Sequence, residues 1–147
     1  MRIEVLREIA QFLNSFEVDG LGLYKYLDWV DSEGSGYEIY VQHLIVHSLR
    51  AKGIDVTMKG KKNRGDCDFF YEGEAVELKT PRDTYPNKYE EAFIGHPKAD
   101  SYLFIHKGKK HYEEACIKAE EHYTMPLAGD DWWLTWMRLD DFKEEVK

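Results

Sequence analysis

The residues best suited to chemistry lie in two neighbouring segments, Asp66–Tyr71 and Ala75–Thr80. Both segments favour β-strands, and the dipeptide Glu72-Gly73 between them suits a tight hairpin turn because glycine tolerates positive φ. If these two residues form the turn, the register of the hairpin brings Asp68 opposite Glu77. The other pairs in this register are Tyr71 with Glu74, Phe70 with Ala75, and Phe69 with Val76.

Two carboxylates that face each other on a strand pair destabilise the fold unless a cation offsets their repulsion. The alternation of side chains places Asp66 and Lys79 on the same face. Oxygen ligands suit Mg²⁺ or Mn²⁺, so we expect a metal bound by Asp68 and Glu77, with Asp66 and the Leu78 backbone carbonyl as further ligands. Asp68 is preferred over Asp66 as the principal ligand because it faces Glu77. Such a metal would activate water for phosphodiester hydrolysis, and Lys79 would orient the nucleophile or stabilise developing charge.

The same residues resemble the signature of the PD-(D/E)xK nuclease superfamily, an acidic residue on one hairpin strand and an acid-x-Lys triplet on the next. Here these elements are Cys67-Asp68 and Glu77-Leu78-Lys79, with cysteine in place of the family's proline. The family also commonly has a glutamate on the helix before the first strand, which implies a catalytic role for Glu38. The resemblance covers Gly34 to Arg138 and implies a restriction-endonuclease-like αβββαβ core.

Basic residues flank this cluster on both sides in the sequence. The loop Lys59–Gly65 lies immediately before the acidic strand, where the phosphate backbone of a substrate would pass. Arg82 and Lys88 follow the triplet closely enough to touch the same substrate, although all of these charges could simply be solvated. The residues expected to bind nucleic acid are Lys59, Lys61, Lys62, Arg64, Arg82 and Lys88.

The composition limits the classes of function that are open. A net charge of -8 over 147 residues argues against a nonspecific nucleic-acid coat, so contact with nucleic acid must be local. The two cysteines, Cys67 and Cys116, are not a disulfide framework, and no apolar run is long enough to span a membrane or resembles a signal peptide. We therefore expect a cytoplasmic protein that has no contact with membranes.

The elements that must position the site follow from hydrophobic periodicity. Helices are expected over 2–16, 21–30, 37–52 (closed by Gly53), 87–93, 111–123 and 140–147. Strands are expected over 54–58, 66–71, 75–80, 101–106 and 132–139. This order predicts an α/β fold, a mixed sheet flanked by helices, in one domain of residues 1–147. Within it, 1–33 is a helical N-terminal addition, 34–139 is the core and 140–147 is a terminal helix.

Structural interpretations compete with several of these assignments. The hairpin face could be solvated, with an ordinary cross-strand ion pair between Lys79 and one of the acids. His43 and His47 have zinc-ligand spacing, but no third ligand follows, so we expect them at the surface. The tryptophans Trp132, Trp133 and Trp136 could stack on bases, but core packing of alternate residues is favoured.

The leading hypothesis is a Mg²⁺-dependent endonuclease that acts on DNA in restriction, repair or junction resolution. One alternative on the same scaffold is an RNA-cleaving toxin or processing nuclease. The other is a catalytically silent module that binds a partner protein or nucleic acid. A domain of this size that cuts both strands of a duplex would act as a homodimer.

The basic loop generates a prediction about salt dependence. Replacement of Lys61, Lys62 and Arg64 by Ala should weaken nucleic-acid binding whatever the sequence, and should lower the salt dependence by about one phosphate contact per lost charge. The measurement is the slope of log affinity against log salt concentration. An unchanged slope would remove this loop from the interface.

Overall fold

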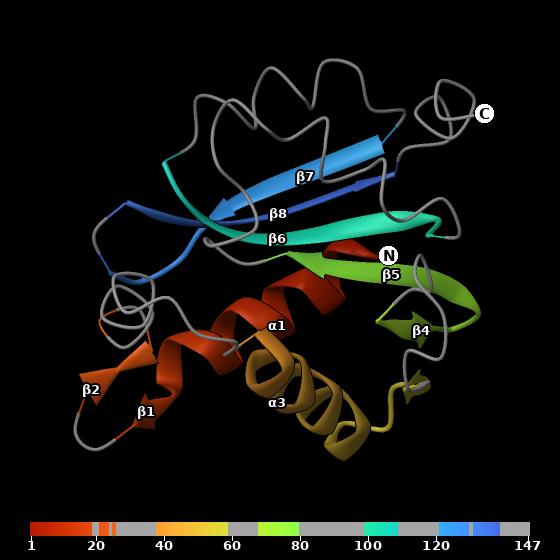
Figure 1. The fold of residues 1–147 in the computed structure, drawn as a ribbon, viewed down its shortest axis with the longest axis horizontal. Coiled ribbons are helices and arrows are strands. Elements are labelled where there is room, and N and C mark those ends of the chain that lie inside the picture. The colour runs from red at the N-terminus through yellow and green to blue at the C-terminus, as the bar shows by residue number, and fades with distance from the viewer. Residues whose placement is uncertain are drawn as a thin grey trace.

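The computed structural model describes residues 1–18, 21–23, 25, 38–58, 68–79, 99–108, 121–129 and 131–138. Helices α1 and α3 span Ile3–Ser15 and Glu38–Ala51, and both lie on the same side of the main sheet (Figure 1). A separate short hairpin consists of β1, Glu17–Val18, and β2, Leu21–Gly22. Within the described ranges, no helix has the length and apolarity needed to cross a membrane.

The main sheet has six strands in the order β3-β4-β5-β6-β8-β7. They span Val56–Met58 (β3), Phe69–Tyr71 (β4), Glu74–Lys79 (β5), Ser101–Lys107 (β6), Glu121–Pro126 (β7) and Trp132–Arg138 (β8). β5 pairs with β4 in antiparallel and with β6 in parallel orientation, and the other pairs in this sheet are antiparallel. The predicted mixed sheet is confirmed, and β5 lies in its interior between two partners.

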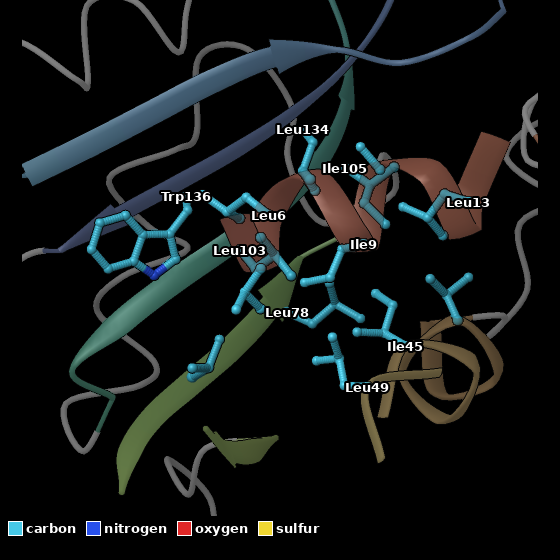
Figure 2. Packing of buried hydrophobic residues seen from close by; sticks show 14 of the residues in the cluster. Leu6, Ile9, Leu13, Ile45, Leu49, Leu78, Leu103, Ile105, Leu134 and Trp136 are labelled. Atoms are coloured by element: carbon cyan, nitrogen blue, oxygen red, sulfur yellow. The ribbon is translucent and has the colours of Figure 1, made fainter. Parts of the chain in front are cut away.

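A single apolar cluster joins the helices to the sheet. Figure 2 shows Leu6, Ile9 and Leu13 of α1 together with Ile45 and Leu49 of α3 in this cluster. The sheet contributes Val76, Leu78, Leu103, Ile105, Leu134 and Trp136. α1 forms because its apolar residues recur at helical spacing, and it contacts both α3 and the distant strand β8. The helix predicted over 2–16 is therefore confirmed.

The face of the sheet that points away from the helices is called the site face below. Because side chains alternate along a strand, it carries the residues between those of the apolar cluster. These residues are Glu77 and Lys79 of β5, Tyr102, Phe104 and His106 of β6, and Trp133, Thr135 and Met137 of β8. The predicted core packing of alternate tryptophans is confirmed, since Trp132 and Trp136 are buried on the helix side.

The helix predicted over 37–52 is confirmed as α3, and its C-terminus is closed as expected by Gly53 at φ +78°. The Gly53 N–H donates to the Arg50 carbonyl at 2.9 Å, and the Ile54 N–H donates to the Leu49 carbonyl at 3.1 Å. These two bonds form a Schellman motif, which satisfies the last carbonyls of the helix. The motif turns the chain directly into β3.

The buried side of α3 differs slightly from the predicted apolar stripe. The stripe expected from helical periodicity contains Tyr37, Val41, Leu44, Ile45, Ser48 and Leu49. Of these, Leu44 and Ser48 are only half-buried, whereas Gln42 and Val46, which lie outside the stripe, are buried. The difference arises because α3 packs against α1 as well as against the sheet, so its buried arc is turned toward both. The polar side chain of Gln42 is thereby brought into the interior.

Two helix predictions are wrong at some of the residues that the structure describes. Leu21 and Gly22, predicted to begin a helix over 21–30, pair instead with Glu17–Val18 as a hairpin, whereas Leu23 and Lys25 are helical as predicted. The sequence between the two strands, Asp19-Gly20, is a strong two-residue hairpin signal that the helical spacing obscured. Residues 121–123, predicted as the end of a helix over 111–123, belong to β7, because every residue of Glu121–Pro126 pairs with a residue of β8. The predicted helices over 87–93 and 140–147 lie outside the described residues.

A chain of hydrogen bonds crosses β6, β8 and β7 on the site face, and its central bond is buried. His106 bonds through Nδ1 to the Gly108 carbonyl at 2.6 Å and through Nε2 to Thr135 Oγ1 at 2.7 Å, and Thr135 Oγ1 lies 3.1 Å from Thr124 Oγ1. A carbonyl can only accept, so His106 Nδ1 donates and Nε2 accepts from Thr135, which in turn accepts from Thr124. Burial lowers the pKa of His106 to about 4, against the smaller opposing effects of the Gly108 carbonyl and the Asp131 charge.

This histidine generates a prediction about pH. In the unfolded chain His106 takes up a proton near its ordinary pKa of 6.5, whereas the folded protein resists protonation down to about 4. Stability should therefore fall as the pH drops through this window, by up to roughly 3 kcal/mol from this group alone.

The measurement is urea unfolding between pH 7 and pH 4.5 for the wild type and for His106→Gln, which cannot take up the proton. The variant should lose less stability on acidification than the wild type. Equal losses in the two proteins would show that His106 does not cause the pH dependence.

Candidate active site

The β4–β5 hairpin brings the predicted site residues together through its turn. Glu72 and Gly73 both have positive φ, 46° and 87°, as a tight two-residue hairpin turn requires. Three residue pairs flank this turn, namely Phe69 with Val76, Phe70 with Ala75 and Tyr71 with Glu74. The register predicted from the sequence is confirmed at every described pair of this ladder.

Asp68 lies one residue before β4, so it is not part of the ladder. Its backbone N–H donates to the Val76 carbonyl at 3.1 Å, and its Oδ2 accepts from the Leu78 N–H at 2.8 Å. The reason for the second bond is that the backbone ladder with β4 ends at Val76, which leaves the Leu78 N–H to be paired by a side chain. Asp68 was predicted to lie directly opposite Glu77 in the ladder. Instead, its carboxylate bonds the N–H of the Glu77–Leu78 peptide.

Glu77 and Lys79 lie on the site face at successive alternate positions of β5. Glu77 is opposite Tyr102 and Lys79 is opposite Phe104 on the parallel strand β6. The Glu77 side chain is fully buried at 0% exposure and Asp68 is 4% exposed, while Lys79 is half-buried. The triplet therefore presents an acid and a base on one face, as its spacing predicts.

The Tyr102 hydroxyl is affected by this acid. Burial raises the pKa of Tyr102 well above its ordinary value, and the negative charge of Glu77 raises it further. The phenol therefore stays neutral, and it faces Glu77 across the β5–β6 pair. Tyr102 is a neighbour of the site that the sequence analysis did not single out.

The backbone carbonyl of Leu78 is directed toward the same region as the Asp68 carboxylate. In an extended strand the N–H and C=O of one residue point to the same side, and the Leu78 N–H points to Asp68. Ala75, three residues earlier in β5, points the other way. Its N–H donates to the Asp100 carboxylate and its carbonyl accepts from the Asp100 N–H, both on the β6 side. The role of the Leu78 carbonyl as a metal ligand stays a prediction from the sequence.

Oxygen atoms of this kind are the ligands that a hard divalent cation prefers. Burial of a carboxylate is costly unless positive charge or hydrogen bonds compensate it, and both Asp68 and Glu77 are buried. In the described part of the chain, no three His, Cys, Asp or Glu side chains gather as a metal site. Asp68, Glu77 and the Leu78 carbonyl would thus leave several positions to water or substrate, which is the kind of partial coordination that Mg²⁺ accepts.

Several predicted site residues are not placed by this geometry. Glu38 is the first residue of α3, but its side chain lies outside the described part of the structure. The remaining residues outside the described ranges are Asp66, Lys59, Lys61, Lys62, Arg64, Arg82 and Lys88. Their assignments stay predictions from the sequence.

Gln42 is a site neighbour that the sequence analysis missed. Gln42 lies on the buried side of α3, and its Nε2 donates to the Asp68 backbone carbonyl at 3.0 Å. The missed signal is its spacing, because Gln42, Val46 and Leu49 recur as a second row of helical positions beside the predicted stripe. His43 and His47, on the outer side of the same helix, are exposed as predicted.

Comparisons with known proteins leave the geometry as the source of functional inference. No family model matches the chain, and neither the curated proteins nor the solved structures gave a match.

The hydrogen bond between Asp68 and Leu78 generates a paired prediction. Asp68→Asn keeps an oxygen that can accept from the Leu78 N–H and removes one of two buried negative charges, so the metal-free variant should be as stable as the wild type or more stable. Asp68→Ala leaves that N–H without its acceptor and should cost about 1–3 kcal/mol. The stability changes of both variants are measured by chemical unfolding in EDTA. Equal destabilisation by the two substitutions would contradict this account of the carboxylate.

Proposed function

We propose that this protein is a metal-dependent nuclease of the PD-(D/E)xK type that hydrolyses phosphodiester bonds in DNA. The observation that carries the proposal is that the β4–β5 hairpin buries two acids, Asp68 and Glu77. The Asp68 carboxylate accepts from the N–H of the Glu77–Leu78 peptide, and Lys79 lies two residues after Glu77 on the same face of β5. An ordinary solvated hairpin face would not bury two acids.

The strand order supports this proposal. α3 leads into three antiparallel strands, β3, β4 and β5, and the next strand, β6, lies parallel to β5. This is the order of pairings expected of an αβββαβ core, apart from the second helix, which would fall in the part of the chain outside the described residues. The two elements that carry the motif, β4 and β5, are the second and third strands of that order.

Each residue has a distinct chemical role in the proposed reaction. Asp68, Glu77 and the Leu78 carbonyl would hold Mg²⁺ or Mn²⁺, which supplies Lewis-acid activation of the phosphoryl group and of water. The Lys79 ammonium, half-buried beside Glu77, stabilises negative charge that develops on the phosphate oxygens. The burial of Glu77 strengthens these electrostatic interactions because it excludes water.

The remaining features of the proposal extend from this site. We propose that Glu38 takes part in catalysis, that Asp66 can join the metal ligands, and that Lys59, Lys61, Lys62, Arg64, Arg82 and Lys88 contact the phosphate backbone. A cytoplasmic protein of this size would cut both strands of a duplex as a homodimer. The substrate class follows from the metal chemistry only as far as a phosphodiester, so the test includes RNA.

The test is cleavage of labelled duplex DNA, branched DNA, single-stranded DNA and RNA in Mg²⁺, Mn²⁺ or EDTA. We expect metal-dependent cleavage of DNA that Asp68→Asn, Glu77→Gln and Lys79→Ala each reduce by at least about a hundredfold. Asp66→Ala should leave measurable activity.

Glu72→Gln is the matched control, because Glu72 lies on the same hairpin but is exposed and paired with Arg2 at the turn. It should cleave like the wild type. Cleavage of RNA alone would favour the toxin or processing nuclease, and binding without cleavage would favour the silent module. Activity that survives in Asp68→Asn and Glu77→Gln would refute the proposed site.

A further inference from the structure

Gln42 is a buried amide on a helix face that is otherwise apolar. Its neighbours Val41, Ile45, Val46 and Leu49 are all 0% exposed, and Gln42 itself is 7% exposed. Among the described side chains of α3, it is the only polar one that is buried. A polar group in such a position requires a hydrogen-bond partner, and the structure supplies one in the Asp68 carbonyl at 3.0 Å.

The Asp68 carbonyl is exceptional within the hairpin because Asp68 precedes the first ladder pair, Phe69 with Val76. The regular strand geometry that orients residues within β4 therefore does not hold Asp68. Its position depends on its own N–H bond to Val76, on the carboxylate bond to the Leu78 N–H, and on the bond from Gln42. Only the last of these bonds comes from a different layer of the fold.

We propose that Gln42 is a positioning residue of the active site, which fixes the backbone of Asp68 and so aims its carboxylate at the Glu77–Leu78 peptide. The inference rests on the proposed nuclease function for its catalytic consequence, but not for the positioning itself. Gln42 bonds the backbone carbonyl of Asp68, so it acts through Asp68 and does not touch the reacting atoms.

The physical basis is the coupling between the peptide plane and the side-chain direction. A fixed carbonyl limits the ψ of Asp68, and with the bonded N–H it fixes the direction of the Cα–Cβ bond. Loss of the Gln42 donor would let the plane rotate and displace the carboxylate. A displacement of about 1 Å at a catalytic group can lower the rate by roughly a hundredfold.

The first measurement is hydrogen exchange of the Leu78 amide in Gln42→Met, which preserves the size of the side chain but removes the donor. The Leu78 N–H should exchange at least tenfold faster in this variant, because its acceptor is the carboxylate that Gln42 aims. The Leu103 amide, in the neighbouring strand, should keep its wild-type rate.

The matched control is Val46→Ala, which weakens the same buried helix face without removing a bond to Asp68. It should lower the melting temperature but leave the Leu78 amide as protected, relative to Leu103, as in the wild type. Should Gln42→Met fail to fold, Gln42→Leu provides a second variant without the donor, since leucine also suits a buried helix face. An unchanged Leu78 exchange rate in the folded variant would overturn the proposal.

The second measurement addresses catalysis. With saturating DNA, the single-turnover cleavage rate of Gln42→Met should fall roughly ten- to a hundredfold and the Mg²⁺ concentration for half-maximal rate should rise, while DNA affinity in EDTA stays unchanged. Val46→Ala should keep the wild-type Mg²⁺ midpoint. A wild-type rate and midpoint in Gln42→Met, despite faster Leu78 exchange, would overturn the role in the reaction.

The two measurements separate this inference from the proposed function. If the wild type cleaves no nucleic acid, the nuclease proposal fails, and faster Leu78 exchange in Gln42→Met would still establish that Gln42 positions Asp68. If the wild type cleaves and Leu78 exchange does not respond to the substitution, the nuclease proposal stands and the inference about Gln42 fails.

Discussion

The turn at Glu72-Gly73 determines which residues of β4 and β5 meet, because positive φ at both positions fits the twist of a two-residue hairpin. A shift of the register by a single residue would move every side chain of β5 to the opposite face. Val76 and Leu78 would then leave the apolar cluster, and Glu77 would replace them against the helices. The turn and the hydrophobic core therefore specify the same register, and the site follows from it.

The interior position of β5 gives the candidate site its rigidity. Glu77 lies on a strand that has hydrogen-bonded neighbours on both sides, and the Asp68 carboxylate is bonded to the backbone of that strand. Such an arrangement has a cost in stability, since burial of a carboxylate removes it from water and must be offset by hydrogen bonds or positive charge. The cost falls on a sheet whose other face is held by both helices (Figure 2).

The sequence was sufficient for the parts of the fold in which local and tertiary preferences agree. The hairpin register, α1, α3 with its Gly53 cap, and the alternation of Glu77 and Lys79 could all be predicted from periodicity and turn chemistry. The end of the ladder before Asp68 could not, because it depends on where pairing stops and not on residue type. Gln42 was missed for a similar reason, since its burial results from the contact of α3 with both α1 and the sheet. Residues 121–123 were predicted to be helical from their local pattern, but they form a strand because pairing with β8, a tertiary contact, outweighs that pattern.

The contact between α1 and β8 has a consequence for biosynthesis. α1 leaves the ribosome before β8, yet one of the surfaces that covers its apolar side belongs to that later strand. Until Trp132–Arg138 has emerged, the exposed leucines and isoleucines of α1 lack part of their partner surface, so the nascent chain cannot complete its core before that point. Contacts of such long sequence separation slow folding and prolong the interval in which chaperones can bind.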